Sequence, residues 1–200
     1  MSGGIGNTTE IYREAWLRHG PGPEALHYTP EGHQRRLDRL CDILPVAPTA
    51  LKVLDFGCGM GDLYPLLKGR RPDTVFDYHG IDLVPEFIAH ARGAHAQAHF
   101  ECGNALDGGI EGRFDYVFAS GLFNKAVDPG LLKKAIAWCF DHCDAGVAFD
   151  FISKNANYFV DDMLYYDPVD ITSWLIAEVS PKFSLHHHFY GANVSVFVYR

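Results

Sequence analysis

Three glycines stand at every second position in the stretch VLDFGCGMGDLYPLL, residues 53–67. Gly57, Gly59 and Gly61 follow an apolar run and an aspartate, and a run with helical character comes next. Glycine at such a turn adopts positive φ without strain and lets a ligand approach main-chain N–H groups that a Cβ would shield. The stretch predicts a strand, a ligand-binding loop and a helix, whereas an ordinary strand-to-helix turn needs only one glycine.

Short apolar runs alternate with helical runs along most of the chain. This alternation is typical of a parallel sheet with helices on its faces. Near the C-terminus two further runs, separated by GAN, predict an antiparallel hairpin. We therefore expect an α/β fold with a doubly wound, mostly parallel sheet and an antiparallel C-terminal hairpin. The expected strands are 51–56, 75–82, 98–103, 114–120, 145–153, 182–190 and 194–200, and the expected helices of this part are 62–70, 84–93, 131–143 and 169–179.

The first 48 residues differ from this pattern. Helical spacing predicts helices at 8–19, behind a Thr8 cap, and at 33–44. Between them the Pro- and Gly-rich stretch 20–32 predicts an irregular loop. We interpret 1–48 as a helical lid or cap on a single ligand-binding domain, 49–200.

Composition limits the function classes. A chain of 200 residues with 48% hydrophobic content fits one globular domain. A formal charge of -8 disfavours binding along a nucleic acid backbone, and five cysteines do not indicate a disulfide framework. The sequence contains neither a signal peptide nor an apolar run of membrane-spanning length, so we expect a cytoplasmic protein without a membrane partner.

Two aspartates at strand ends indicate the kind of ligand. The dinucleotide fingerprint is G-x-G-x-x-G, and here the last glycine comes one residue early. Asp55 places a carboxylate beside the loop, where it would repel a pyrophosphate and favour a positively charged group. Asp82 ends the second strand, where an acid can accept hydrogen bonds from both ribose hydroxyls of an adenosine, or simply cap the next helix.

These segments resemble a known family. VLDFGCGMGDL, YHGIDLVPEFI, FECGNAL and FDYVFASGLFN are similar to the successive motifs of class I S-adenosylmethionine-dependent methyltransferases, from about Lys52 to the C-terminus. GPEALHYTPEGHQRRLDRL and LYYDP also resemble a group of small bacterial methyltransferases. The resemblance implies a Rossmann-like, seven-stranded sheet and S-adenosylmethionine as the cofactor.

The resemblance also implies a role for individual residues. Asp55, Gly57 and Gly59 would line the methionine part of the cofactor. Asp82 would hold the ribose, and Leu83 would touch the adenine. Asn104 stands where many family members carry an aspartate that binds the adenine amino group. The other implied cofactor residues are Cys58, Ala105, Ser120 and Gly121, of which the last two would lie beside the transferable methyl group.

The methyl acceptor is less constrained, because a sulfonium methyl donor carries its own leaving group. We expect transfer to an oxygen or nitrogen of a small metabolite. The segment ASGLFNK lacks the Asn-Pro-Pro-Tyr-like motif of enzymes that methylate planar nitrogens, which counts against a nucleobase or a glutamine side chain. The alternatives are a non-catalytic adenosyl-binding domain and an NAD(P)-dependent oxidoreductase. A protein or RNA acceptor also stays open, and so does the oligomeric state.

Candidates for catalysis come from loops near the expected strand ends. His27 and Tyr28 are candidates for a lid over the cofactor, as is Trp16 unless it anchors a packing helix. Asn124 follows the fourth strand directly, with Lys125 beside it. Asp150, late in the fifth strand, is a candidate base or substrate anchor, or else a buried acid paired elsewhere.

Two further clusters have alternative explanations. His186 and His188 share one strand face and could ligate zinc with Cys139 and Cys143, but cysteines on an amphipathic helix are commonly small buried residues. We therefore expect no metal site. A more modest role also stays open, in which one histidine of this strand serves as a proton acceptor. The aromatic connection after the fifth strand would either wall the acceptor pocket or cover the sheet edge. Its members are Tyr158, Phe159, Tyr165 and Tyr166.

Overall fold

The computed structural model describes residues 3–46, 48–125, 128–157, 159–187 and 190–200. Seven strands and the helices between them follow one another along the chain. The strands are β1 Ala50–Phe56, β2 Val75–Asp82, β3 His99–Cys102, β4 Phe114–Ala119, β5 Cys143–Ile152, β6 Phe183–His187 and β7 Asn193–Tyr199. The α-helices are α1 Gly3–His19, α2 Pro30–Leu40, α3 Leu63–Arg70, α4 Pro85–Ala94, α5 Leu131–Asp141 and α6 Pro168–Trp174. The 3₁₀ turns are η1 Pro23–Leu26, η2 Cys41–Ile43 and η3 Ala105–Asp107, and the π-helical turn η4 Leu175–Val179 continues α6.

One mixed sheet organises the molecule, in the order β3-β2-β1-β4-β5-β7-β6. Strands β1 to β5 pair in parallel, and β7 pairs antiparallel with both β5 and β6. The chain order reverses between β1 and β4, which places the carboxyl ends of the two strands side by side at a switch point. This confirms the predicted α/β fold, including the C-terminal hairpin.

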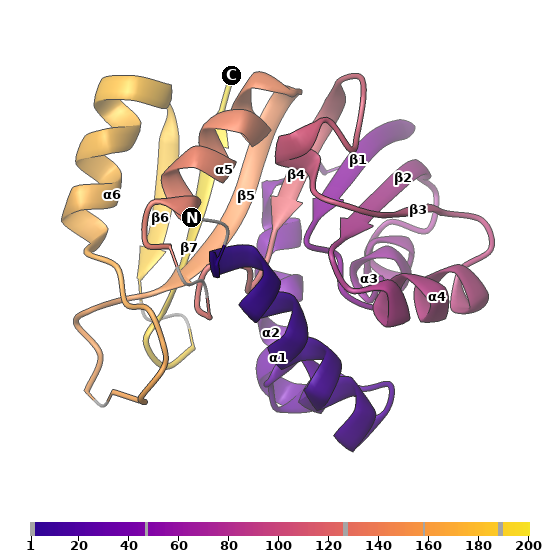
Figure 1. Ribbon diagram of the computed structural model, residues 1–200. Helices are drawn as coiled ribbons and strands as arrows, with labels where there is room; N and C mark the ends of the chain where they lie inside the picture. Colours follow the sequence, from indigo (N-terminus) through magenta and orange to yellow (C-terminus); the bar gives the residue numbers. More distant parts are fainter. Residues whose placement is uncertain (1–2, 47, 126–127, 158, 188–189) are drawn as a thin grey trace.

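Helices cover both faces of the sheet (Figure 1). On one face α5 and α6 bury a large apolar cluster with β4, β5 and β7, centred on Val117, Ile136 and Phe149. On the other face α2, α3 and α4 pack over β1 and β2 around Leu40, Leu67 and Tyr78. No helix of the described residues is long and apolar enough to cross a membrane.

The N-terminal segment is more regular than its sequence predicts. The stretch expected as an irregular loop contains η1 and the first turn of α2. Pro30 occupies the first turn of α2, where its missing N–H costs nothing, and the Thr29 hydroxyl accepts a hydrogen bond from Gly32 N at 3.1 Å. The expectation for 20–32 was therefore wrong, because proline and glycine mark helix starts as well as loops.

Element boundaries also differ from the sequence-based ranges. The first helix begins at Gly3, so Thr8 lies inside it and does not cap it. In the last helix Asp167 is the cap, since its carboxylate accepts from Val169 N at 2.9 Å, and the final turn widens to a π-helix. These shifts leave the strand ends that meet at the switch point unchanged.

Candidate functional site

A cavity opens at the carboxyl ends of β1, β2 and β4. Each of these strands contributes its last residues and the loop that follows. The N-terminal segment contributes the wall opposite the sheet through Tyr12, Leu26 and Tyr28. All ten residues that the sequence assigns to the cofactor line this one cavity: Asp55, Gly57, Cys58, Gly59, Asp82, Leu83, Asn104, Ala105, Ser120 and Gly121.

The glycine loop is shaped by close packing and by its own hydrogen bonds. Gly57 has φ +78°, and a Cβ there would lie 2.6 Å from the Leu122 side chain. The N–H groups of Gly57 and Cys58 donate to Ile81 O at 2.9 and 3.0 Å. These two N–H groups are therefore already used by β2 and are not free for a ligand. A pyrophosphate would find few free donors here, which disfavours a dinucleotide.

Asp82 holds the loop to the second strand. One of its carboxylate oxygens accepts from Gly59 N and the other from Val84 N, each at 2.9 Å. A carboxylate oxygen accepts more than one hydrogen bond, so both oxygens keep capacity for hydroxyl donors from the cavity. Burial raises the pKa of Asp82, and its backbone hydrogen bonds oppose that rise. The residue thus combines the two roles that its position suggested, a turn cap and an acceptor facing the cavity.

Asp55 is a buried acid at the end of β1. It is 3% exposed, and it accepts a hydrogen bond from the Tyr78 hydroxyl at 2.5 Å. Burial raises the pKa of Asp55 to about 7, against the effect of that hydrogen bond, and the charges of Asp82 and Asp62 add to the rise. Three carboxylates therefore gather around one cavity, which favours a cationic ligand group and repels a phosphate.

The raised pKa of Asp55 predicts a pH-dependent stability. Its folded-state pKa of about 7 lies above the ordinary value of 3.8, so its contribution to stability is full below that ordinary value and is lost as pH rises through 7. We expect Asp55→Asn, without ligand, to gain at least about 1 kcal/mol over the wild type between pH 4 and pH 8, since one pKa unit is worth about 1.4 kcal/mol. Urea unfolding at both pH values measures the gain.

Asp62→Asn is the matched control for that experiment. The hydrogen bond from His33 lowers the pKa of Asp62, so its contribution is present above the ordinary value and is lost as pH falls. We expect this variant to lose stability relative to the wild type at pH 8, the opposite sign. The same pH response in both variants would contradict the assignment of a raised pKa to Asp55.

Where the turn after β3 lines the cavity, Asn104 caps the turn η3. Its side-chain oxygen accepts from Leu106 N at 3.1 Å, and its amide group donates to Asp107 at 2.9 Å. A carbonyl oxygen has a second lone pair, so Asn104 still offers an acceptor to a ligand amino group. Ala105 follows it and is buried at 2% exposure. An asparagine at this position caps the turn and offers an acceptor as an aspartate would, but it adds no negative charge to those of Asp55, Asp62 and Asp82.

Behind Ser120 and Gly121 lies Asp150, fully buried on β5. Its carboxylate accepts from the Ser120 hydroxyl at 2.8 Å and from Gly121 N at 2.9 Å. Asp150 is not among the cavity-lining residues, so it holds the loop after β4 in place from behind. Of the two interpretations open at the sequence level, the geometry corresponds to a buried acid paired elsewhere.

Tyr28 closes the cavity at the same loop. Its hydroxyl donates to Gly121 O at 3.1 Å, and a Cβ on Gly121 would lie 2.2 Å from that hydroxyl oxygen. His27 before it has a left-handed backbone with φ 60°, is exposed, and does not line the cavity. Two of the three lid candidates therefore separate: Tyr28 faces the site, and His27 sets the turn that directs it there.

Other residues of the cavity wall escaped the sequence analysis. His33 lies on α2 and bonds Asp62 through Nε2 at 2.9 Å, while Tyr12 on α1 lines the same wall. Trp16 instead packs its ring on Phe87 and His90 of α4, at 5.7 and 5.8 Å, and therefore anchors α1. Asp62 directly follows the last glycine of the loop, so its position was the one available signal, whereas His33 and Tyr12 reach the site from a separate part of the chain.

The aromatic connection after β5 does not reach the cavity in its described part. Tyr166 is buried against Phe151 and donates its hydroxyl to Phe123 O at 3.2 Å. Phe159 is exposed and meets Tyr165 edge to face at 4.8 Å. Tyr158 lies outside the described residues. The geometry corresponds to cover over the sheet edge.

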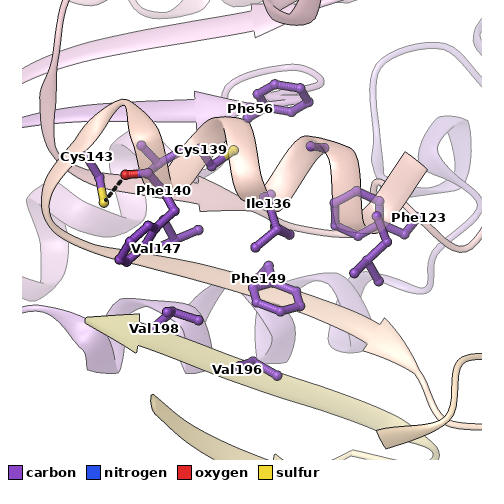
Figure 2. Packing of buried hydrophobic residues seen from close by; sticks show 14 of the residues in the cluster. Phe56, Phe123, Ile136, Cys139, Phe140, Cys143, Val147, Phe149, Val196 and Val198 are labelled. Atoms are coloured by element: carbon purple, nitrogen blue, oxygen red, sulfur yellow. Dashed lines mark hydrogen bonds between the residues drawn. The ribbon is translucent and has the colours of Figure 1, made fainter. Parts of the chain in front are cut away.

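The histidine and cysteine candidates are also placed apart. Cys139 and Cys143 are fully buried among Ile136, Phe149 and other apolar side chains, and the Cys143 thiol donates to Phe140 O at 3.4 Å (Figure 2). The ring of His186 packs on Phe197 at 5.4 Å, and His188 lies outside the described residues. Within the described ranges, one group has the spacing to share a metal ion, Asp77, His79 and His99 on β2 and β3, away from the cavity.

Comparisons with known proteins agree with this geometry. Residues 53–146 match the family model described as a methyltransferase domain. No curated protein matches the chain. Many solved structures share the fold, although all three described next are at most 20% identical in sequence.

Magnesium protoporphyrin IX methyltransferase from Synechocystis PCC 6803, with bound S-adenosylhomocysteine, has 17% identity and a TM-score of 0.68 over 97% of this chain and 94% of its own. A TehB-like S-adenosylmethionine-dependent methyltransferase from Corynebacterium glutamicum has 20% identity and a TM-score of 0.61 over 98% and 100%. An amino pentose methyltransferase from Micromonospora echinaspora has 16% identity and a TM-score of 0.61 over 94% and 95%. The family-model match over residues 53–146 and the seven-stranded fold make this chain similar to class I S-adenosylmethionine-dependent methyltransferases.

Proposed function

We propose that the methyl acceptor is a small molecule, methylated on an oxygen or a nitrogen. The observation that carries this proposal is the wall built by the N-terminal segment. Leu26, Tyr28 and Leu37 line the cavity opposite the loop after β4, where the resemblance to the family places the transferable methyl. A polymeric acceptor would have to displace these side chains, whereas a small molecule could enter the cavity that they enclose. The net charge of -8 also disfavours a nucleic acid.

The chain's own residues would act mainly by positioning. Bound S-adenosylmethionine supplies a methyl group on a sulfonium, and alignment of acceptor, methyl and sulfur in a dry site is the main catalytic requirement. Asp150 fixes the loop at Ser120 and Gly121 through two hydrogen bonds. Leu26 and Leu122 exclude water from the same end of the cavity. Good alignment of this kind is worth roughly 7 to 11 kcal/mol.

Tyr28 would cover the acceptor end of the cavity and would not act as a base. Burial is the main cause of the raised pKa of Tyr28, with a smaller contribution from Asp150, while Arg36 opposes it. The phenol therefore stays protonated at neutral pH and does not serve as a base. A carboxylate oxygen acceptor needs no proton removed, so the site is complete without one. In this proposal residues 1–48 are the cover of the site and 49–200 form the catalytic domain.

The test is transfer of labelled methyl from S-adenosylmethionine to fractions of a bacterial extract. We expect label in the low-mass fraction, with an equimolar amount of S-adenosylhomocysteine formed. Label in protein or RNA would contradict the small-molecule acceptor. Cofactor binding without transfer to any fraction would favour the non-catalytic alternative. Calorimetric titration with NAD and NADP is the control for the oxidoreductase alternative, and we expect no heat of binding.

A further inference from the structure

Three buried polar atoms near the cavity have no hydrogen-bond partner: Nη1 of Arg36 and both the amide oxygen and amide nitrogen of Asn124. Arg36 is 5% exposed and Asn124 is 1% exposed. Among the described residues Arg36 is the one buried lysine or arginine. Leaving such groups unsatisfied is costly, because each buried orphan loses its hydration without compensation.

The two side chains converge on Tyr28 from different elements. Arg36 lies on α2, with its guanidinium carbon 4.0 Å from the centre of the Tyr28 ring. Asn124 follows β4, three residues after Gly121, whose carbonyl holds the Tyr28 hydroxyl. Tyr28 itself lines the cavity. The Tyr28 ring therefore stands between the cavity and a buried arginine.

No carboxylate of the described residues forms an ion pair with Arg36. Asp150 is the nearby acid that raises the pKa of Arg36 together with Tyr28, against the larger lowering effect of burial. Both oxygens of Asp150 are already engaged by Ser120 and Gly121. Asp150 compensates the charge of Arg36 without forming an ion pair or hydrogen bond with it, so the guanidinium can still take an anion in direct contact, as buried charges in proteins normally do.

The donors that remain free define that partner. Arginine presents a planar fork of N–H groups, and the Asn124 amide adds two more donors and one acceptor. A carboxylate matches a guanidinium in bidentate geometry and accepts from an amide as well. We propose that the acceptor carries a carboxylate, which binds Arg36 and Asn124 when Tyr28 turns aside. This inference rests on the proposed function, since it names the substrate class of the same site.

A carboxylate could reach Arg36 and Asn124 after a local movement of the Tyr28 side chain. The Tyr28 hydroxyl donates one hydrogen bond, to Gly121 O, and Arg36 and Asn124 approach the same hydroxyl, so an anion that took its place would meet both side chains. The residue before it, His27, already has a left-handed backbone. A carboxylate that replaced the ring edge would gain a charge-assisted hydrogen bond, roughly twice as strong as the neutral one lost. The anion would then lie beside the loop after β4, so the carboxylate is either the methylated group or the anchor for a neighbouring one.

The experiment compares small carboxylates with their neutral amides as probes. Formate, acetate and benzoate, and then formamide, acetamide and benzamide, are titrated by calorimetry into the protein with and without saturating S-adenosylhomocysteine. We expect at least one carboxylate to bind about tenfold more tightly than its amide. Arg36→Gln should remove that preference. Arg35→Gln, the same charge change on the exposed neighbour that pairs with Glu31, should keep it.

Each outcome separates the two proposals. Equal binding of carboxylates and amides by the wild type, or a preference that persists in Arg36→Gln, would overturn the carboxylate inference. Failure of the wild type to bind S-adenosylhomocysteine would instead overturn the proposed function, while the probe titrations without it still report on Arg36. Where thermal melting shows that Arg36→Gln does not fold, Asn124→Asp takes its place, because a second acid beside Arg36 should abolish the carboxylate preference.

Discussion

Replacing Asp82 by alanine should weaken S-adenosylhomocysteine binding by about 100-fold or more. The two oxygens of this carboxylate face the cavity while they hold Gly59 N and Val84 N. Hydrogen bonds to a charged group are worth about 1.5 to 3 kcal/mol each, so losing two of them from the ribose costs about 3 to 6 kcal/mol. Calorimetric titration of the wild type and the variant measures the loss.

Asp77→Ala is the matched control, because it removes an exposed aspartate from the same strand. It should bind S-adenosylhomocysteine as the wild type does. Thermal melting of Asp82→Ala without ligand shows how much of its loss comes from a loosened glycine loop. Binding by Asp82→Ala within threefold of the wild type would contradict the assignment of Asp82 to the ribose.

Asp150→Ala should lower the free energy of unfolding by about 3 kcal/mol. This carboxylate is fully buried, and removing it leaves the Ser120 hydroxyl and Gly121 N without their acceptor. It also leaves the buried Arg36 without its nearest compensating charge. Breaking a buried charged network costs about 3 to 5 kcal/mol, and each orphaned donor about 1 to 3 kcal/mol. Urea unfolding measures the change, and methyl transfer should fall with it.

Two further variants calibrate that result. Ser120→Ala removes one donor and leaves the charge, so it should cost only about 1 kcal/mol. Asp144→Ala, an exposed acid at the start of the same strand, should change the stability by no more than about 0.5 kcal/mol. If Asp150→Ala proved as mild as Asp144→Ala, Asp150 would not be the residue that holds the loop.

The fold and the cofactor side of the site follow from local sequence. Gly57, Asp55 and Asp82 each sit at a strand end, and strand ends can be read from the alternation of apolar and helical runs. In a parallel sheet all those ends meet at one edge, so the ten expected residues line one cavity. The predictions of this kind need no knowledge of how distant segments pack.

The acceptor side depends on packing that local patterns do not encode. Arg36 has the spacing of an ordinary surface arginine, and only the path of α2 over the sheet buries it. The His33 and Asp62 pair joins residues 29 positions apart. Nothing in the sequence indicated that the main-chain N–H groups of the glycine loop had partners, but those of Gly57 and Cys58 donate to a carbonyl oxygen of β2. Such pairings arise from tertiary contacts alone.

The cover of the site rests on a small apolar cluster of its own. Ala25, Met60, Val84 and Phe87 form this cluster with the aromatic residues of α1, apart from the two large clusters on the sheet faces. Local opening costs less free energy where fewer apolar contacts break. We therefore expect the N-terminal segment to open while the sheet stays folded, and we expect the few side chains of this cluster to set the rate at which ligands exchange. Changes at Ala25 or Met60, which belong to the cluster but do not line the cavity, would tune turnover without altering the cavity wall.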